Sequence, residues 1–497
     1  MKDEKDIDNK LEQEEEKEVL NPFHLEGHKP RTRREFMAQG FLGSFAFGLA
    51  PSLMSLLSSK DAFAADCATP TFKSKTPVIV IELAGGGNIP GSNVMVGGQG
   101  GQEDFMSAYN SLGLPPNMHP KMAGMINNEM GLVFHSDSGI LRGIQSATSV
   151  STRMNSEGAI FCATSADDTA NNQFNPVFWL NKAGAKGQVN QLAGTDQSES
   201  GGRSKAPKES VNPLIAPIKI TSSNDARNLV SLGNQLNSYD SSKMNKILDT
   251  MSELSNNKLN SIPRRSLPDA IKSLLDCSIS QSKSQVASFG PNALDVNQDL
   301  VATEVMKKIS STGLRNRVAP IAKLVIDGYI GAGTIVLNGY DYHDKTRKRG
   351  EVADFQLGQI MGAIMELAAA KQKDVVIYVV TDGGVSTDGS VDSSPEGRGK
   401  LNWTGDSGQR SSSFMMVYKK DGKPRLRANA NRQIGHFTNG VINKTAKLTS
   451  NSVINLAKAM VANYLALHGE EGKLAEVVND NPFGSKLDEY LIFEKLR

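Results

Sequence analysis

Short runs that are apolar at nearly every position limit the fold of this chain more than any other feature. They occur at 78–81, 132–134, 334–337, 375–380 and 414–418. A strand that is apolar on both faces belongs in a parallel sheet with helices packed on each side. We therefore expect these runs to be buried strands of one sheet.

Helical periodicity separates some of these runs. One helix is expected to lead into the run at 375, and its buried face combines Leu357, Ile360, Met361, Ile364, Leu367 and Ala368. A second helix is expected over 452–467, with Asn451 as its cap and Gly469 just past its end. Alternating strands and helices predict an α/β fold, a three-layer α/β/α sandwich around a mostly parallel sheet.

Three other stretches complete the expected organisation. Residues 194–212 are rich in Ser, Gly and Lys and predict a surface loop. Residues 223–316 are polar and helical, with breaks at Pro263 and Pro268, and predict a helical insertion or lid. Residues 85–101 are glycine-rich but lack the Gly-Lys-Ser/Thr and GxGxxG patterns of phosphate loops, so a flexible loop at a strand end is expected.

Residues 1–64 have the layout of a bacterial export signal. A charged stretch precedes Arg33-Arg34, an apolar but glycine-rich run follows from 38 to 57, and Ala62 and Ala64 supply small residues two apart. The arginine pair indicates the twin-arginine translocase as the partner during export. The alternative is a membrane anchor that stays, but the apolar run is short for a spanning helix.

We therefore expect cleavage near Ala64, and no stable membrane span afterwards. The expected location is the periplasm or the medium, and 65–497 is expected to form one α/β domain. Asp66 precedes Cys67, which makes a poor lipoprotein motif.

Charge and cysteine content exclude some classes of protein. The net charge of +2 gives no basic face for nucleic acid. Cys67, Cys162 and Cys277 form no zinc-binding pattern. In an oxidising compartment one pair could form a disulfide, and three unpaired thiols are the alternative.

Acidic residues and histidines follow several expected strands. Asp341 and His343 come after the run at 334–337, Asp382 comes after 375–380, and Asp406 and His436 lie further on. Ligands gather at the carboxyl ends of strands in open α/β sheets. Carboxylate and imidazole ligands suit a divalent cation such as zinc, manganese, calcium or iron. The alternative is that both aspartates cap turns and His343 is a surface residue.

Serine hydrolysis finds little support in the sequence. No G-x-S-x-G motif precedes a helix. Ser156 is the candidate nucleophile for a metal enzyme, and a helix-capping role is the alternative.

The stretch 321–388 resembles the uncharacterised bacterial family called domain of unknown function 1501. The similar segments are GTIVLNGYDYHD at 333–344, the helix from 351, DVVIYVVTDGG at 374–384 and the opening strand with its Gly-Gly-Asn turn at 77–88. That family looks like a twin-arginine exported branch of the alkaline phosphatase and sulfatase superfamily. The resemblance implies an alkaline-phosphatase-like fold. It also implies that Asp341 and His343, in a motif usually written Gly-Trp-Asp-x-His, bind a metal.

The chain departs from the family pattern at three places. Asp382 stands where the family usually has Ser-Glu-Phe-Gly-Arg, Ser407 replaces the histidine expected after Asp406, and Ile89 replaces an aspartate after Asn88. A two-metal site needs about six good ligands, and this chain offers about half of them. The resemblance therefore implies one weakly bound metal or a loss of hydrolysis.

Two hypotheses follow. The first is an exported protein of alkaline-phosphatase-like fold with a degenerate or weakly active metal site at Asp341, His343, Asp382 and Asp406. The second is a metal-dependent hydrolase of phosphate or sulfate esters that uses the same residues. The expected cofactor in both is one divalent metal: zinc, calcium or manganese.

Overall fold

The computed structural model describes residues 74–166, 171–196, 204–229 and 292–496, with five isolated positions between 246 and 257. All of these residues belong to one unit, Pro51–Arg497. The expected export signal 1–64, Cys67, Cys277 and the breaks at Pro263 and Pro268 lie outside the described residues.

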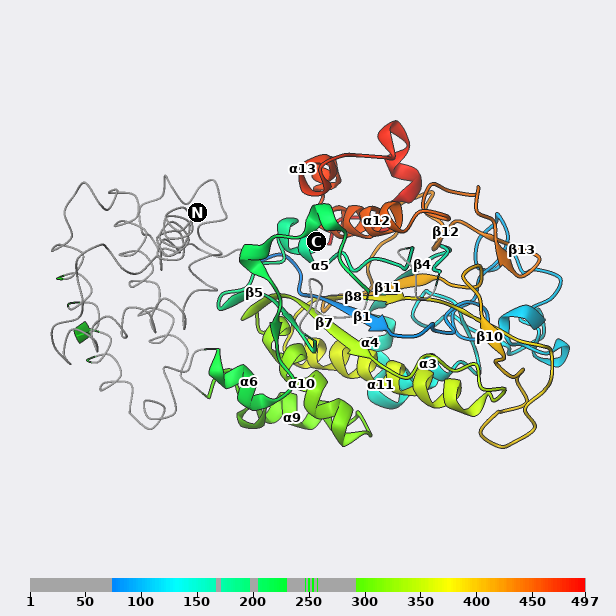
Figure 1. The fold of residues 1–497 in the computed structure, drawn as a ribbon, viewed down its shortest axis with the longest axis horizontal. Helices are drawn as coiled ribbons and strands as arrows, with labels where there is room; N and C mark the ends of the chain where they lie inside the picture. Colours follow the sequence, from blue (N-terminus) through cyan, green and yellow to red (C-terminus); the bar gives the residue numbers. More distant parts are fainter. Residues whose placement is uncertain are drawn as a thin grey trace, which may run out of the picture. The chain divides into compact units, whose positions relative to one another are not determined.

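An eight-stranded sheet lies at the centre of this unit (Figure 1), in the order β12-β4-β11-β8-β1-β7-β5-β6. β1 lies between β7 and β8 and is parallel to both, whereas β11 is antiparallel to its neighbours β8 and β4. The prediction of an α/β fold with a mostly parallel sheet is confirmed. The strands are β1 Val78–Leu83, β4 Ser156–Phe161, β5 Asn190–Gly194, β6 Ile218–Lys219, β7 Ile330–Leu337, β8 Val375–Thr381, β11 Ser413–Tyr418 and β12 Gln433–Ile434.

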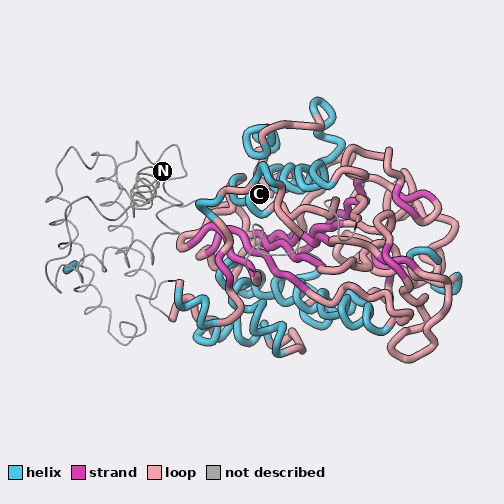
Figure 2. The backbone as a smooth tube through the Cα atoms, viewed as in Figure 1, coloured by secondary structure: helices cyan, strands magenta, loops and turns pink. Residues whose placement is uncertain are grey.

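Helices cover both faces of the sheet, as Figures 1 and 2 show. Alternate residues of β1 enter different cores: Ile79 and Ile81 pack in one hydrophobic cluster, and Val78 and Val80 in the other. This explains why the run is apolar at every position. The first face is covered by α3 Gly139–Ala147, α9 Leu300–Met306, α10 Thr312–Ile326 and α11 Lys348–Ala370, and the second by α5 Val177–Lys182, α12 Val453–Ala466 and α13 Leu474–Val478.

Four of the five apolar runs are central strands, and the fifth is not. The run at 132–134 ends in β3, Phe134–His135, which pairs with β2, Ile126–Asn127, in a separate two-stranded antiparallel sheet. The prediction of a central strand there is wrong. β4 and β5 join the central sheet next to its edge strands although they contain Gly, Ser, Asn and Gln, because their buried polar side chains find backbone carbonyl partners in and next to these strands.

The two predicted helices are confirmed as α11 and α12. The cap of α12 is Ser452, whose hydroxyl accepts from the backbone N–H of Asn455, so the assignment of Asn451 as cap is wrong by one residue. Gly469 follows the helix with a positive φ of 68°.

The described parts of the expected helical insertion form α6, Ser223–Asn228, together with α9 and the start of α10. α9 and α10 pack against α11, so they belong to the helical layer rather than to a separate lid. The remainder of that stretch lies outside the described residues.

Short strands shape the carboxyl edge of the sheet. β9, Val385–Ser386, follows β8 and pairs with β10, Gly405–Asp406. β13, Phe437–Thr438, pairs with β14, Val441–Ile442. Among the described residues, no helix has the length and apolar character that crossing a bilayer requires.

Candidate metal site

Three of the four predicted ligands lie together at the carboxyl edge of the sheet. The loop after β7 carries Asp341 and His343, and Asp406 is the last residue of β10. β7 and β8 flank β1 in parallel, so the loops that follow them leave from the same edge. The short β9–β10 pairing then returns Asp406 to this edge from a position 63 residues after His343 in the sequence.

The ligand atoms of these three residues all lie within 4.8 Å of one another. Nε2 of His343 is 2.6 Å from Oδ1 of Asp341 and 3.9 Å from Oδ1 of Asp406. Ligand atoms around a tetrahedral zinc ion are roughly 3.4 Å apart, given bonds of about 2.0–2.1 Å. The two measured separations bracket that value, so small side-chain rotations would bring the set to binding geometry.

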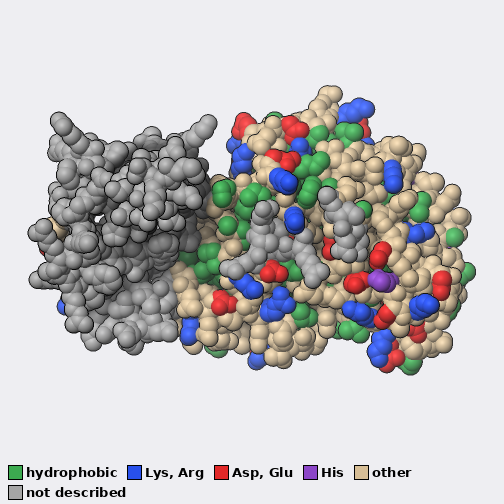
Figure 3. All heavy atoms as spheres, in the orientation of Figure 1, with side chains coloured by type: hydrophobic (Ala, Val, Ile, Leu, Met, Phe, Trp, Pro, Cys, Tyr) green, Lys and Arg blue, Asp and Glu red, His purple; other side chains and the backbone are tan. Residues whose placement is uncertain are grey.

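All three side chains are open to solvent. Asp341, His343 and Asp406 are 63%, 43% and 46% exposed. On the face drawn in Figure 3, acidic side chains surround a histidine at the surface. One imidazole and two carboxylates can hold a divalent cation and leave further coordination positions facing solvent.

Asp382, the fourth predicted ligand, is not part of this set. Its side chain is buried, and Oδ1 accepts hydrogen bonds from the backbone N–H groups of Gly85 and Gly86 at 2.5 and 2.9 Å. Both glycines have positive φ values. The Asp382 carboxylate therefore holds the turn after β1 and lies outside the cluster of Asp341, His343 and Asp406, and its role as a metal ligand stays a prediction.

Gly85 sets how closely that turn approaches the metal-binding loop. A Cβ at Gly85 would lie 2.6 Å from the backbone nitrogen of Asp341. Residues 86–97 are buried, whereas a flexible loop was expected. The glycine-rich segment is therefore packed into the protein, and its Gly85 and Asn88 lie against the loop that carries Asp341 and His343.

Tyr342 lies between the two ligands Asp341 and His343 and attaches their loop to the glycine-rich segment. Its side chain is fully buried, and its hydroxyl accepts a 2.5 Å hydrogen bond from the backbone N–H of Asn88. Burial raises the pKa of Tyr342 well above its usual range, so it stays neutral. The alternation of exposed and buried residues explains why Asp341 and His343 point to solvent on the same side.

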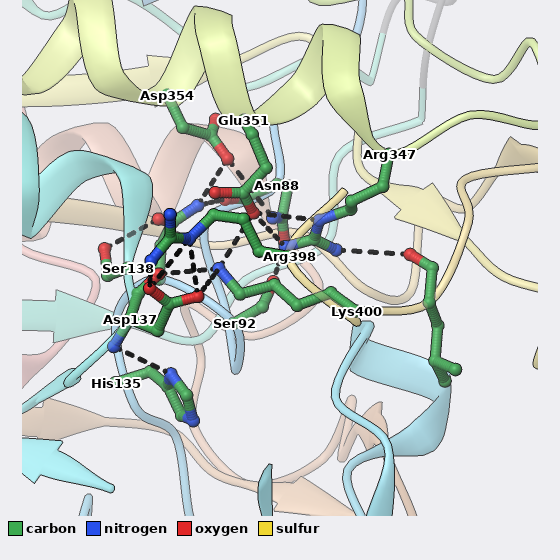
Figure 4. Close-up of polar contacts among 12 residues, drawn as sticks. Asn88, Ser92, His135, Asp137, Ser138, Arg347, Glu351, Asp354, Arg398 and Lys400 are labelled. Carbon is green, nitrogen blue, oxygen red and sulfur yellow. Dashed lines mark hydrogen bonds and ion pairs between the residues drawn. The ribbon is translucent and has the colours of Figure 1, made fainter. Parts of the chain in front are cut away.

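A buried carboxyl group lies directly beneath Tyr342. The side chain of Asp354, on α11, accepts hydrogen bonds from the side-chain amides of Asn88 and Asn93 at 3.3 and 2.7 Å, as Figure 4 shows. Burial, reinforced by the negative charge of Glu351, raises the pKa of Asp354 to about 7. This carboxyl group therefore changes its protonation state near neutral pH.

A buried histidine lies in the same region. Nδ1 of His135 accepts from the backbone N–H of Asp137, and Nε2 lies 3.1 Å from the carbonyl oxygen of Met118, which assigns the proton to Nε2. Burial and the nearby Lys400 cation lower the pKa of His135 to about 4. His135 is therefore neutral over most of the physiological range.

Two further candidates do not reach the site. Ser156 is fully buried at the start of β4, where its hydroxyl donates to the carbonyl oxygen of Thr152. It neither caps a helix nor has the accessibility that a nucleophile needs. Nε2 of His436 contacts the side-chain amide of Asn443, and His436 is not in the ligand set.

Cys162 is buried, it has no disulfide partner within the part of the chain that the structure describes, and burial raises the pKa of its thiol. It is therefore unreactive in the folded protein.

The sequence interpretation missed the buried charged residues at the N-terminal end of α11, including its N-cap Arg347. Arg347, Glu351 and Asp354 precede Leu357 at helical spacing and continue its buried face. Extending the apolar stripe of this helix towards its N-terminus would have found them, because charges on a buried face need partners.

Comparisons with known proteins leave the family open. The chain matches no protein-family model, and no curated protein matches it.

Proposed function

We propose that the chain is an exported protein that binds one divalent cation through Asp341, His343 and Asp406. The observation that carries this proposal is the convergence of the three ligand atoms within 4.8 Å at the carboxyl edge of a mostly parallel sheet. The export part of the proposal rests on the sequence of residues 1–64.

The ligand set favours zinc or manganese over calcium. Calcium takes six to eight oxygen ligands, whereas here one of three ligands is an imidazole. Three protein ligands with an open fourth position are typical of zinc sites that also bind water or substrate.

The relationship to the family of domain of unknown function 1501, and through it to alkaline phosphatases, is part of this proposal. It is supported by the GYDYH motif at 339–343, which supplies two of the three ligands. The missing ligands make a single-metal, degenerate site the better interpretation.

Metal binding by the full chain tests the proposal. We expect one equivalent of Zn²⁺ by calorimetry and by elemental analysis after dialysis. Since the protein supplies only three ligands, losing one should be costly, and His343→Gln and Asp406→Asn should each weaken binding at least tenfold. Asp344→Asn is the matched control, because Asp344 is an exposed acidic neighbour outside the ligand set. Equal binding by all four proteins would contradict the proposal.

A hydrolase of phosphate or sulfate esters is the second candidate. The exposure of the ligands favours it, because a metal held there would have room to polarise an ester oxygen. The burial of Ser156 argues against its use as a nucleophile of the phosphatase type. Zinc-dependent hydrolysis of p-nitrophenyl phosphate or sulfate that disappears in Asp341→Asn would decide for the hydrolase.

A further inference from the structure

The two segments that carry the metal ligands touch each other through backbone hydrogen bonds. The backbone N–H of Lys345 donates to the carbonyl oxygen of Trp403 at 2.9 Å, and that of Trp403 donates to Thr346 at 3.2 Å. These contacts lie two residues after His343 and three residues before Asp406. The distance between the ligands therefore depends on how firmly these two segments are joined.

Arg347 extends this junction with its side chain. The residue is fully buried, its guanidinium carbon lies 4.5 Å from the ring centre of Trp403, and one terminal nitrogen donates to the carbonyl oxygen of Leu401 at 3.5 Å. Arg347 belongs to the segment of Asp341 and His343, and both of its contacts belong to the segment of Asp406. A planar guanidinium can stack and donate at once, which lysine cannot do.

The Glu351 carboxylate accepts hydrogen bonds from both segments. Its Oε1 accepts from Nε of Arg347 at 3.0 Å and from Nζ of Lys400 at 2.8 Å, and its Oε2 accepts from Arg142 at 2.6 Å. Lys400 is fully buried and also donates to the carbonyl oxygen of Asp137 at 2.6 Å. Figure 4 shows Arg347 and Lys400 approaching Glu351 from different segments.

Stability alone is a poor reason for this arrangement. Buried ion pairs contribute little to stability on balance, because the loss of hydration offsets their attraction. Their location is the informative feature, since one carboxylate links Arg347, four residues after His343, to Lys400, six residues before Asp406. Partners around a metal's ligands commonly control its affinity in this way.

We propose that Arg347 and Lys400, joined through Glu351, are positioning residues that set the separation between Asp406 and the Asp341–His343 pair. The inference rests on the proposed metal site and goes beyond it, because it assigns control of metal affinity to residues that do not touch the metal. Loosening the junction would let Asp406 move away from the other two ligands while the sheet stays intact.

Binding of Co²⁺ to the full chain tests this inference, because its visible absorption spectrum reports coordination geometry as well as affinity. We expect Arg347→Lys and Lys400→Met to weaken Co²⁺ binding about tenfold and to change the spectrum of the bound ion. Lys323→Met is the matched control. Lys323 is also buried in an ion-pair network, with Asp299 and Asp327, but at the C-terminal end of α10, which leads into the start of β7. It should lose stability to urea and keep the affinity and spectrum of the unaltered protein.

The outcomes separate the two proposals. If the unaltered chain binds no Co²⁺, the metal site itself is rejected, and the positioning role falls with it. If the unaltered chain binds Co²⁺ and both variants bind it with the same affinity and spectrum, only the positioning role is rejected. Should either variant fail to fold in urea titrations, Trp403→Phe serves instead. It keeps the backbone junction and part of the ring, and should give a smaller change in the same direction.

Discussion

At the scale of single residues, the buried Asp354 links the stability of the protein to pH. An unfolded aspartate loses its proton near its ordinary value of 3.8, whereas burial keeps Asp354 protonated up to about pH 7. The folded state thus holds one more proton between about pH 4 and 7. Its contribution to the free energy of unfolding is fully present below pH 4 and falls as the pH rises to 7, by at most about 1.4 kcal/mol per pH unit.

Asp354→Asn should remove this dependence, because the amide keeps the shape and cannot ionise. From pH 5 to pH 7 the unaltered protein should lose stability relative to the variant. The free energy of unfolding of the variant minus that of the unaltered protein should therefore increase over this range and stay constant above it. Urea titrations at unit pH steps measure it. His135 acts in the opposite sense over about pH 4 to 6.5, since its pKa is lowered, but it is present in both proteins and cancels. If the free energies of unfolding of the two proteins changed with pH in parallel, the assignment of a raised pKa to Asp354 would be contradicted.

At the scale of secondary-structure elements, glycines set the close contact between α3 and α11. A Cβ at Gly358 would lie 2.0 Å from the carbonyl oxygen of Ile140, and one at Gly143 would lie 2.2 Å from that of Phe355. These neighbours are helix backbone atoms, which cannot move aside as a side-chain end can. The contact also places α11, and with it Asp354, beneath the glycine-rich segment that carries Asn93.

Gly358→Ala should therefore destabilise the protein by about 1–3 kcal/mol, the usual cost of overpacking. Gly313→Ala is the matched control. Gly313 lies in the first turn of α10 with nothing within 4 Å of its Cβ position, so alanine there should be neutral or slightly stabilising. Thermal unfolding of the two variants provides the comparison. Equal melting temperatures would show that α3 and α11 can move apart without a loss of stability.

The sequence predicts best the elements whose signal is continuous along the chain. β1, β7, β8 and β11 were predictable because apolar residues on both faces leave few other structures. β4 escaped prediction because Ser156, Glu157 and Gly158 leave it without a continuous apolar run. For the site, spacing pointed to Asp341, His343 and Asp382 alike. Only the fold shows that Asp382 is buried, that its Oδ1 accepts from Gly85 and Gly86, and that it lies outside the ligand cluster.

At the scale of the whole molecule, the cores and the candidate metal site are spatially separate. The two hydrophobic clusters lie on opposite faces of the sheet, whereas Asp341, His343 and Asp406 are exposed at its edge. The ligands therefore add little to the packing that folds the chain. The proposed twin-arginine route carries folded proteins, so loss of the metal ligands and loss of the proposed export signal should have different consequences.

We expect Arg33→Lys combined with Arg34→Lys to keep the full chain in the cytoplasm, because the translocase recognises the arginine pair. Asp406→Asn should be exported as the unaltered chain is, since Asp406 is exposed and outside both cores. Fractionation of a bacterium with this translocase, followed by detection of the precursor and of a form shortened by about 64 residues, as the cleavage pattern implies, measures both. Export of the double-lysine variant would reject the proposed route. Retention of Asp406→Asn would instead show that metal loading precedes export, and that the edge of the sheet contributes to the folded state that the translocase accepts.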